Sequence, residues 1–244
     1  MKIGIKLWTT NYHLYPNIVK LYSEGKINHL ELKYVIGEEK NLHILKEAKI
    51  PIVLHSPNTV DGACFSDNQI EKNTKLFKDM VKIADYLDAK GIIIHPEIGS
   101  KENFIRFIGA VNSKRIIIEN VPKKTLVGTS VGYSPDDIKE YLSGDCNFCL
   151  DFCHAVKAAR SLSKDYKEYI KEFLELNPVM FHLCDGFKEE EMDEHLNLGE
   201  GNFDLKFIKE CIEQSEHQMV TLETPKENLD LNQDLENINY LKNI

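Results

Sequence analysis

The chain has 244 residues, of which 42% are hydrophobic and 28% charged, an ordinary composition for a globular protein. This composition excludes a disordered chain, a collagen and a disulfide-bonded miniprotein, and no apolar run approaches the roughly 20 residues needed to span a bilayer. The formal net charge of −9 argues against a nucleic-acid-binding surface, which needs clustered lysine and arginine, although acids that hold cations would present less negative charge. We expect a cytoplasmic protein, because the N-terminal segment enters a strand-like pattern at once and lacks the features of a signal peptide.

Short apolar or β-branched runs alternate with amphipathic stretches along the whole chain. The runs predict eight strands, at Lys2–Leu7, His29–Tyr34, Ile50–Leu54, Gly91–Ile94, Arg115–Glu119, Phe148–Asp151, Val179–Leu183 and Met219–Glu223. The amphipathic stretches predict helices, among them Ile70–Leu87, a helix capped by Ser134 with Pro135 at its first position, and Asp204–Ile212.

Unbroken apolar runs such as Ile92–Ile94 and Ile116–Ile118 are typical of parallel strands that are buried on both faces. Eight alternating strand–helix units therefore predict an α/β fold, a single (β/α)₈ TIM-barrel domain over residues 1–244, with its site at the C-terminal ends of the strands. The alternative is an open doubly wound sheet, which would normally carry a Gly-rich phosphate loop after an early strand. This sequence has no such loop.

Histidines and acids follow the ends of six consecutive predicted strands, from the third to the eighth. They are His55, His95, Glu119, Asp151 with His154, His182 and Glu223, and the loop after the seventh strand adds Asp193 and His195. Because the C-terminal ends of parallel strands meet at one mouth of a barrel, this pattern predicts a metal site.

Imidazole and carboxylate ligands favour Zn²⁺, Mn²⁺ or Fe²⁺ over Mg²⁺ or Ca²⁺. The nine candidates exceed the about four to six ligands that one ion takes, and four adjacent carboxylates would repel one another without cations. We therefore expect two or three ions, with some bridging by carboxylates.

Other side chains are given simpler interpretations. The six cysteines are predicted to be free thiols, and Cys146-x-x-Cys149, which enters an apolar strand with no second such motif, is predicted to supply buried small side chains rather than a redox or zinc site. Lys123 and Lys124 are candidates for phosphate contacts, while Lys157 and Arg160 are expected to face solvent. The candidates for lining a substrate pocket, or for packing at the barrel mouth, are Trp8, Tyr12 and Tyr34.

Taken together, these residues resemble the superfamily of xylose isomerase-like TIM barrels, and most closely the endonuclease IV family of zinc-dependent apurinic/apyrimidinic endonucleases. The most specific matches are Leu150-Asp151-x-Cys153-His154-Ala155 and Asp193-x-His195-x-x-Leu198-Gly199-Glu200-Gly201. The resemblance implies three zinc ions: one held by His55, His95 and Glu119, a second bridged by Glu119 and completed by Asp151, His182 and Glu223, and a third held by His154, Asp193 and His195.

The departures from endonuclease IV concern the handling of DNA and leave the ligand set complete. The Gly-rich loop that follows the first strand in that family has no counterpart in Trp8–Tyr12, and the aromatic residue that follows the first ligand is absent after His55. The residue between Asp193 and His195, which is basic in that family, is Glu194 here. These differences put a DNA substrate in question.

Three functions remain open at this point. A phosphoester hydrolase, with abasic-site DNA as the nearest family substrate, would use Glu119 and Asp151 to position an attacking water and Glu223 to orient it. An isomerase or epimerase of a small sugar, sugar phosphate or keto-acid would hold one ion with Glu119, Asp151, His182 and Glu223, and use the two glutamates as acid and base. A metal-stabilised barrel that only binds a ligand is the third. The extra residues His55, His95, Asp193 and His195 favour the hydrolase.

Overall fold

Eight parallel strands close into a barrel in the order β1-β10-β9-β8-β5-β4-β3-β2. The computed structural model describes residues 1–142, 145–226 and 230–244. The barrel strands are β1 (Lys2–Trp8), β2 (His29–Lys33), β3 (Ile52–His55), β4 (Ile92–Ile94), β5 (Ile116–Glu119), β8 (Asn147–Asp151), β9 (Met180–Leu183) and β10 (Met219–Leu222). The predicted (β/α)₈ barrel is confirmed, and each predicted strand ends within two residues of the observed one.

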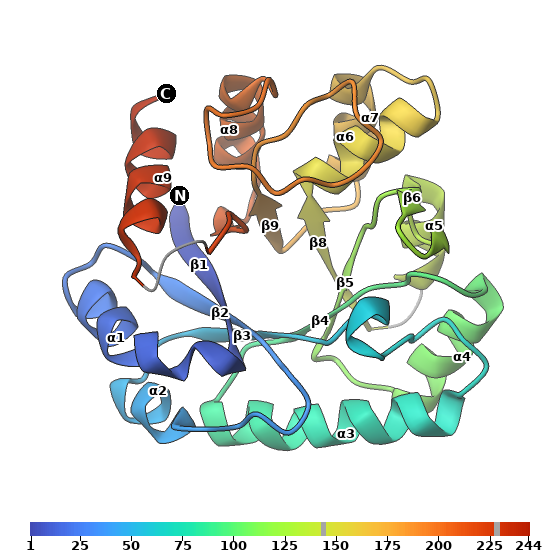
Figure 1. Cartoon of the computed structure of the whole chain (residues 1–244). Helices are drawn as coiled ribbons and strands as arrows, with labels where there is room; N and C mark the ends of the chain where they lie inside the picture. Colours follow the sequence, from blue (N-terminus) through green and yellow to red (C-terminus); the bar gives the residue numbers. More distant parts are fainter. Residues whose placement is uncertain (143–144, 227–229) are drawn as a thin grey trace.

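Helices surround the barrel as an outer ring (Figure 1). They are α1 (Tyr15–Ser23), α2 (Leu42–Ala48), α3 (Ile70–Leu87), α4 (Lys101–Val111), α5 (Pro135–Tyr141), α6 (Phe152–Ser161), α7 (Tyr166–Leu174), α8 (Leu205–Gln214) and α9 (Asn232–Asn243). The predicted cap of α5 is confirmed, because the Ser134 hydroxyl accepts a hydrogen bond from the Asp137 backbone N–H at 3.2 Å. Within the described residues, no helix is both long and apolar enough to cross a membrane.

Short elements on the connecting loops were not predicted. A two-stranded hairpin, β6 (Lys124–Thr125) and β7 (Gly128–Thr129), follows β5, and the 3₁₀ helices η1 (Thr9–Leu14) and η2 (Thr59–Asp61) follow β1 and β3. Elements of two to six residues carry too little periodicity to be recognised in a sequence. Both the hairpin and η2 contribute to the mouth of the barrel.

The core has two parts that lie on opposite sides of the barrel wall. Alternate strand residues such as Ile92 and Ile94 face outward and join the large cluster between strands and helices. The intervening residues form a small separate cluster inside the barrel, made of Val53, Ile93, Ile117, Cys149 and Met180. Cys149 is thus a buried side chain, as expected from the sequence, whereas Cys146, which was also expected to be buried, is only half-buried.

Candidate metal centre

A ring of polar side chains lies directly above the apolar layer inside the barrel. Side chains on a strand alternate between its two faces, so a residue two positions beyond an inward-facing one also faces inward. His55 follows Val53, and Glu119 follows Ile117, in this way. The same step of two leads from Ile93 to His95, from Cys149 to Asp151 and from Met180 to His182.

The nine predicted ligand residues come together at this level. Ligand atoms within 4.8 Å of one another form three groups that match the sets expected from the sequence: His55 with His95 and Glu119; Glu119 with Asp151, His182 and Glu223; and His154 with Asp193 and His195. Glu119 belongs to two of the groups, and its Oε2 lies 2.9 Å from His95 Nε2 and 3.3 Å from His182 Nδ1. The geometry therefore allows a carboxylate bridge at Glu119.

Each of the five imidazoles is oriented by a hydrogen bond on one of its two ring nitrogens. The Nδ1 atoms of His55, His154 and His195 bond to the backbone oxygens of Ser56, Asn120 and Glu223 at 2.7, 2.8 and 2.9 Å. His95 Nδ1 bonds to Glu97 at 3.1 Å, and His182 instead bonds through Nε2 to Glu31 at 2.6 Å. Because an acceptor fixes the proton on one ring nitrogen, the other nitrogen presents its lone pair to the site.

Six buried atoms among the candidate ligands make no hydrogen bond of acceptable geometry within the described residues, even where a carboxylate oxygen lies near. They are His55 Nε2, His95 Nε2, His182 Nδ1, both oxygens of Glu119, and Asp151 Oδ2. Buried polar atoms are normally paired, and these are the atoms that would coordinate a cation. Histidine nitrogens and carboxylate oxygens suit Zn²⁺, Mn²⁺ or Fe²⁺, so the residues present fit a group of divalent ions.

Proton balance in the site is consistent with this fit. Burial lowers the pKa of His55 to about 4, which keeps its imidazole neutral. Burial alone would also lower the pKa of His95, but the charges of Glu119 and Glu97 raise it to about 9. A proton on an imidazole such as that of His95 balances part of the negative charge of the carboxylates. A bound cation would take over this role and displace the proton.

Thiols also lie beside the ligand atoms. Cys149 groups with Glu119 and His182, and Cys153 and Cys184 group with Asp193. Burial raises the pKa of Cys149 to about 12, so its thiol stays protonated. Cys153 donates a hydrogen bond from Sγ to Asp193 Oδ1 at 3.0 Å, which leaves Asp193 Oδ2 facing His154 and His195. The Cys153 thiol thus orients the carboxylate of Asp193, a candidate ligand.

Lys6 and Glu31 belong to the site, although sequence reasoning did not select them. Lys6 Nζ donates to Glu223 Oε1 at 2.6 Å and lies 3.3 Å from Glu31 Oε1. Burial would lower the pKa of Lys6, but Glu223 and Glu31 raise it above the usual value, so the ammonium is charged. For Glu31 the sequence does carry a signal. In β2, charged side chains at Glu31 and Lys33 alternate with apolar ones, which places both charges on one face of the strand.

Asp185 organises the loop that carries Asp193 and His195. Its carboxylate accepts hydrogen bonds from the backbone N–H groups of Gly186, Gly199, Gly201 and Phe203 at 2.8–3.3 Å. A Cβ at Gly201 would lie 2.3 Å from the Gly186 carbonyl oxygen, so this position requires glycine. The backbone of the Leu198–Gly201 motif therefore passes close to the segment at Gly186.

Lys157 does not face solvent, contrary to the prediction. Its side chain is fully buried, and Nζ donates to Glu194 Oε2 at 2.6 Å and to the Phe187 carbonyl at 2.8 Å. The loop between Asp185 and Phe203 covers the outer face of α6, so residues 152–159 are all buried. Arg160 is exposed, as expected, with Nε donating to the Glu189 carbonyl. Glu194, which replaces a basic residue of the endonuclease IV pattern, thus points inward to a buried ammonium.

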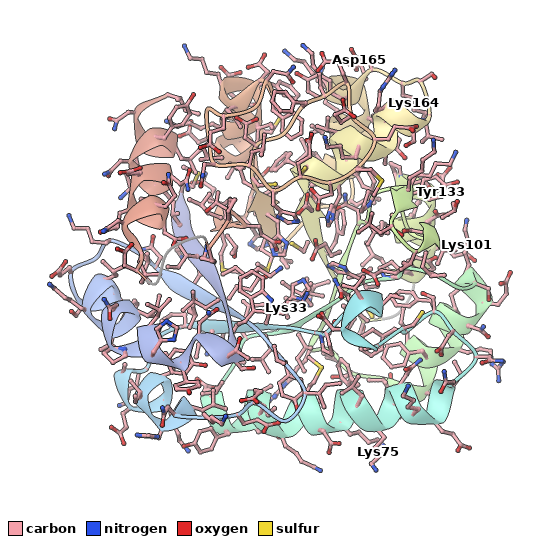
Figure 2. All side chains as sticks on the ribbon, in the orientation of Figure 1. Lys33, Lys75, Lys101, Tyr133, Lys164 and Asp165 are labelled. Atoms are coloured by element: carbon pink, nitrogen blue, oxygen red, sulfur yellow. The ribbon has the colours of Figure 1, made fainter. Side chains whose placement is uncertain are left out.

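A cavity of about 440 Å³ opens above the ligand residues at the mouth of the barrel. Trp8 lines this cavity, whereas Tyr34 donates its hydroxyl hydrogen to Glu39 and Tyr12 packs against the core, so only one of the three predicted aromatic residues lines it. Lys124 also lines it, but Lys123 lies over the Tyr133 ring. Figure 2 shows Lys33, another lining residue, inside the ring of helices, while Lys75 and Lys164 lie outside it.

Comparison with known proteins agrees with this architecture. A curated relative, "Probable endonuclease 4" of Halothermothrix orenii, is 29% identical over 210 residues, which cover 75% of each chain. A solved D-tagatose 3-epimerase-like protein superposes with a TM-score of 0.77 at 17% identity, covering 99% of this chain and 96% of that one. Endonuclease IV of Thermus thermophilus superposes with a TM-score of 0.68 at 16% identity, covering 99% and 98%.

The two solved structures share the fold with this chain. Residues 38–244 match the sequence profile of the family described as "Xylose isomerase-like TIM barrel". This match covers most of the chain and includes all nine candidate ligand residues, so the chain belongs to the xylose isomerase-like TIM barrel family.

Proposed function

We propose that the protein is a divalent-metal-dependent phosphoester hydrolase of the endonuclease IV type, in which the nine mouth residues hold two or three ions. Zn²⁺ is the first candidate, and Mn²⁺ or Fe²⁺ would suit the same ligands. The name shared by its curated relatives makes abasic-site DNA the first polymeric substrate to test.

One observation carries this proposal: the three ligand groups adjoin in a single mouth, and two of them share Glu119. A single ion would need only the group of Glu119, Asp151, His182 and Glu223. The other five residues, His55, His95, His154, Asp193 and His195, would then hold no ion. Clusters of two or more ions are typical of enzymes that cleave phosphate esters by in-line displacement.

Bound divalent ions would supply acidification of a water molecule and neutralisation of charge on the phosphoryl oxygens. The chain's own residues do the positioning. Glu119 and Asp151, buried and held on strand ends, accept hydrogen bonds from the attacking water and fix its direction. Lys6 anchors Glu223 at 2.6 Å, so that Glu223 orients the same water from the end of β10, three strands away from β5 around the barrel.

Metal analysis of the purified protein after loading with Zn²⁺ tests the proposal. We expect two or three ions per chain, the loss of one ion in Asp193→Asn, and unchanged content in the control His43→Gln, whose side chain is exposed on α2. The loaded protein should hydrolyse a member of a panel of phosphate esters that includes an abasic-site duplex, and Glu119→Gln should lose that activity. A content of one ion or fewer would refute the proposal.

A single-metal sugar isomerase or epimerase is the second candidate. The observation in its favour is that Glu119 and Glu223 both approach His182 Nδ1, at 3.3 and 2.6 Å, within one four-residue group. Two carboxylates flanking one ion could remove and return a proton at neighbouring carbon atoms. Exchange of solvent deuterium into a ketose, without cleavage of any phosphate ester, would favour this candidate over the hydrolase.

A further inference from the structure

Exposed apolar side chains gather around the entrance of the mouth cavity. Of the nine exposed large apolar side chains in the described part of the chain, four line this cavity. They are Val60 on η2, Leu126 and Val127 at the turn of the β6–β7 hairpin, and Met192 just before Asp193, with exposed fractions of 67, 88, 50 and 36%. We call these four residues the apolar rim. Apolar patches bordered by polar residues mark binding sites on soluble proteins.

The hairpin turn holds its part of the rim in place without help from the core. Lys124 pairs with Thr129, and the Thr125 hydroxyl donates to the Gly128 carbonyl at 3.1 Å and accepts from the Val127 N–H at 3.3 Å. The chain therefore presents Leu126 at the entrance through local hydrogen bonds, even though the side chain buries little surface of its own.

The lysines that line the cavity already have acidic partners. Lys33 Nζ lies 2.9 Å from Asp61, Lys124 Nζ lies 2.5 Å from Glu191, and Lys6 contacts Glu223 and Glu31. A nucleic-acid strand carries one negative charge about every 3.4 Å and is held by unpaired lysine and arginine. An entrance with paired lysines, on a chain of net charge −9, does not match a polyanion.

The volume of the cavity agrees with a small ligand. At about 440 Å³ it falls in the range of sites that enclose one small molecule. Such sites combine apolar walls with a few polar groups that fix orientation. Here the polar groups are the ligand residues at the bottom of the cavity, and the apolar surface is the rim.

We propose that the substrate is a low-molecular-weight phosphate ester whose alcohol part is apolar, with the phosphate at the ligand residues and the alkyl or aryl group against the rim. The inference rests on the hydrolase function proposed above. In the reaction, the water oxygen forms a new bond to phosphorus and the ester P–O bond breaks, with its electron pair passing to the leaving oxygen. That oxygen takes one proton of the water, so the products are an alcohol or phenol and inorganic phosphate.

Trp8 allows binding to be measured without turnover, because it is the one tryptophan of the chain and lines the cavity. The probes are phenylphosphonate and methylphosphonate, titrated by Trp8 fluorescence into the Zn²⁺-loaded protein. Because the phenyl ring removes additional apolar surface from water, we expect it to bind at least about tenfold more tightly. Leu126→Ser and Val60→Ser should each reduce that ratio about threefold or more, while Ile105→Ser, an exposed apolar residue on α4 outside the cavity, should leave it unchanged.

The same preparation should release phosphate from phenyl phosphate. Equal binding of the two phosphonates would overturn the inference, as would displacement of phenylphosphonate by an abasic-site duplex at lower concentration than by phenyl phosphate. The two proposals fail in different ways. Fewer than two ions per chain refutes the hydrolase itself, whereas two or more ions with no binding of either phosphonate overturns only the inference about its substrate.

Discussion

The buried pair Lys157–Glu194 gives the sharpest test of how the site loop is held. Lys157 is fully buried, while the Glu194 side chain is 23% exposed. Glu194→Gln removes the charge that compensates a buried ammonium, and leaves that ammonium with the Phe187 carbonyl and an amide oxygen. Breaking a buried pair in this way costs about 3–5 kcal/mol, and we expect the lower end, about 3 kcal/mol, because the carbonyl contact remains.

Lys157→Met should cost much less. Glu194 keeps its hydrogen bond from the Phe187 N–H at 2.9 Å and its access to water, so the loss should be about 1 kcal/mol. The double variant contains no buried charge and should resemble Lys157→Met rather than the sum of the two changes.

The wild type, the two single variants and the double variant form a double-mutant cycle. Urea unfolding of the metal-free proteins, followed by circular dichroism, measures the free energy of unfolding of all four. The control is Glu172→Gln in the Lys164–Glu172 pair, whose side chains are 47 and 48% exposed, and which should change the free energy of unfolding by under about 0.5 kcal/mol. Additive effects in the cycle, or a Glu194→Gln effect no larger than the control, would refute the reasoning.

Three further results are expected. Burial lowers the pKa of His29 to about 4, whereas a histidine in the unfolded chain has a pKa of about 6.5. Between these two pH values the unfolded chain binds more protons at this residue than the folded chain does. The stability that the neutral His29 contributes is therefore complete above pH 6.5, and about 3 kcal/mol of it is lost as the pH falls toward 4. Urea unfolding at pH 7.5 and 4.5 should therefore differ less in His29→Gln than in the wild type, and equal differences would contradict this. Glu31→Gln should weaken Zn²⁺ binding about 10–100-fold in competition with a chromophoric chelator, because Glu31 fixes the His182 tautomer, and unaltered affinity would exclude that role. Gly201→Ala should destabilise the fold by about 2 kcal/mol or more, because the added Cβ would meet the Gly186 carbonyl oxygen. Gly109→Ala on α4, where a Cβ meets nothing, should be neutral or stabilising. Thermal unfolding of both variants beside the wild type measures the difference, and equal effects would contradict the reasoning.

The barrel, and the gathering of the candidate ligand residues at its mouth, could be predicted because both follow from a period of two. Runs such as Ile116–Glu119 give the strand, and the alternation within the run puts Glu119 on the same inner face as Ile117. Since all C-terminal strand ends open at one mouth, residues far apart in the sequence could be grouped without knowledge of any contact.

The supporting contacts could not be predicted, because they depend on which distant segments meet. Lys6 is one charged residue inside an apolar strand, and its partners lie 25 and 217 positions away along the chain. Lys157 was assigned to the solvent face of a helix because helices of this fold usually have one exposed side, and α6 is an exception that the loop after β9 creates. A pattern within one element reports which face turns inward, and it says nothing of what a later loop will cover.

The ligand residues and the apolar rim are physically separable parts of the site. Six of the nine candidate ligand residues stand on or directly after strands that are hydrogen-bonded on both sides around a closed barrel, so a change there alters the core as well as the chemistry. Val60 and Leu126 stand on short loop elements and bury little surface, so substitutions there should change the free energy of unfolding by no more than about 0.5 kcal/mol. Under the proposed hydrolase function, one barrel with one layer of ligand residues can therefore admit different esters through changes in the rim alone, and the substrate preference of this chain should be decided at the hairpin and η2 rather than at the strand ends.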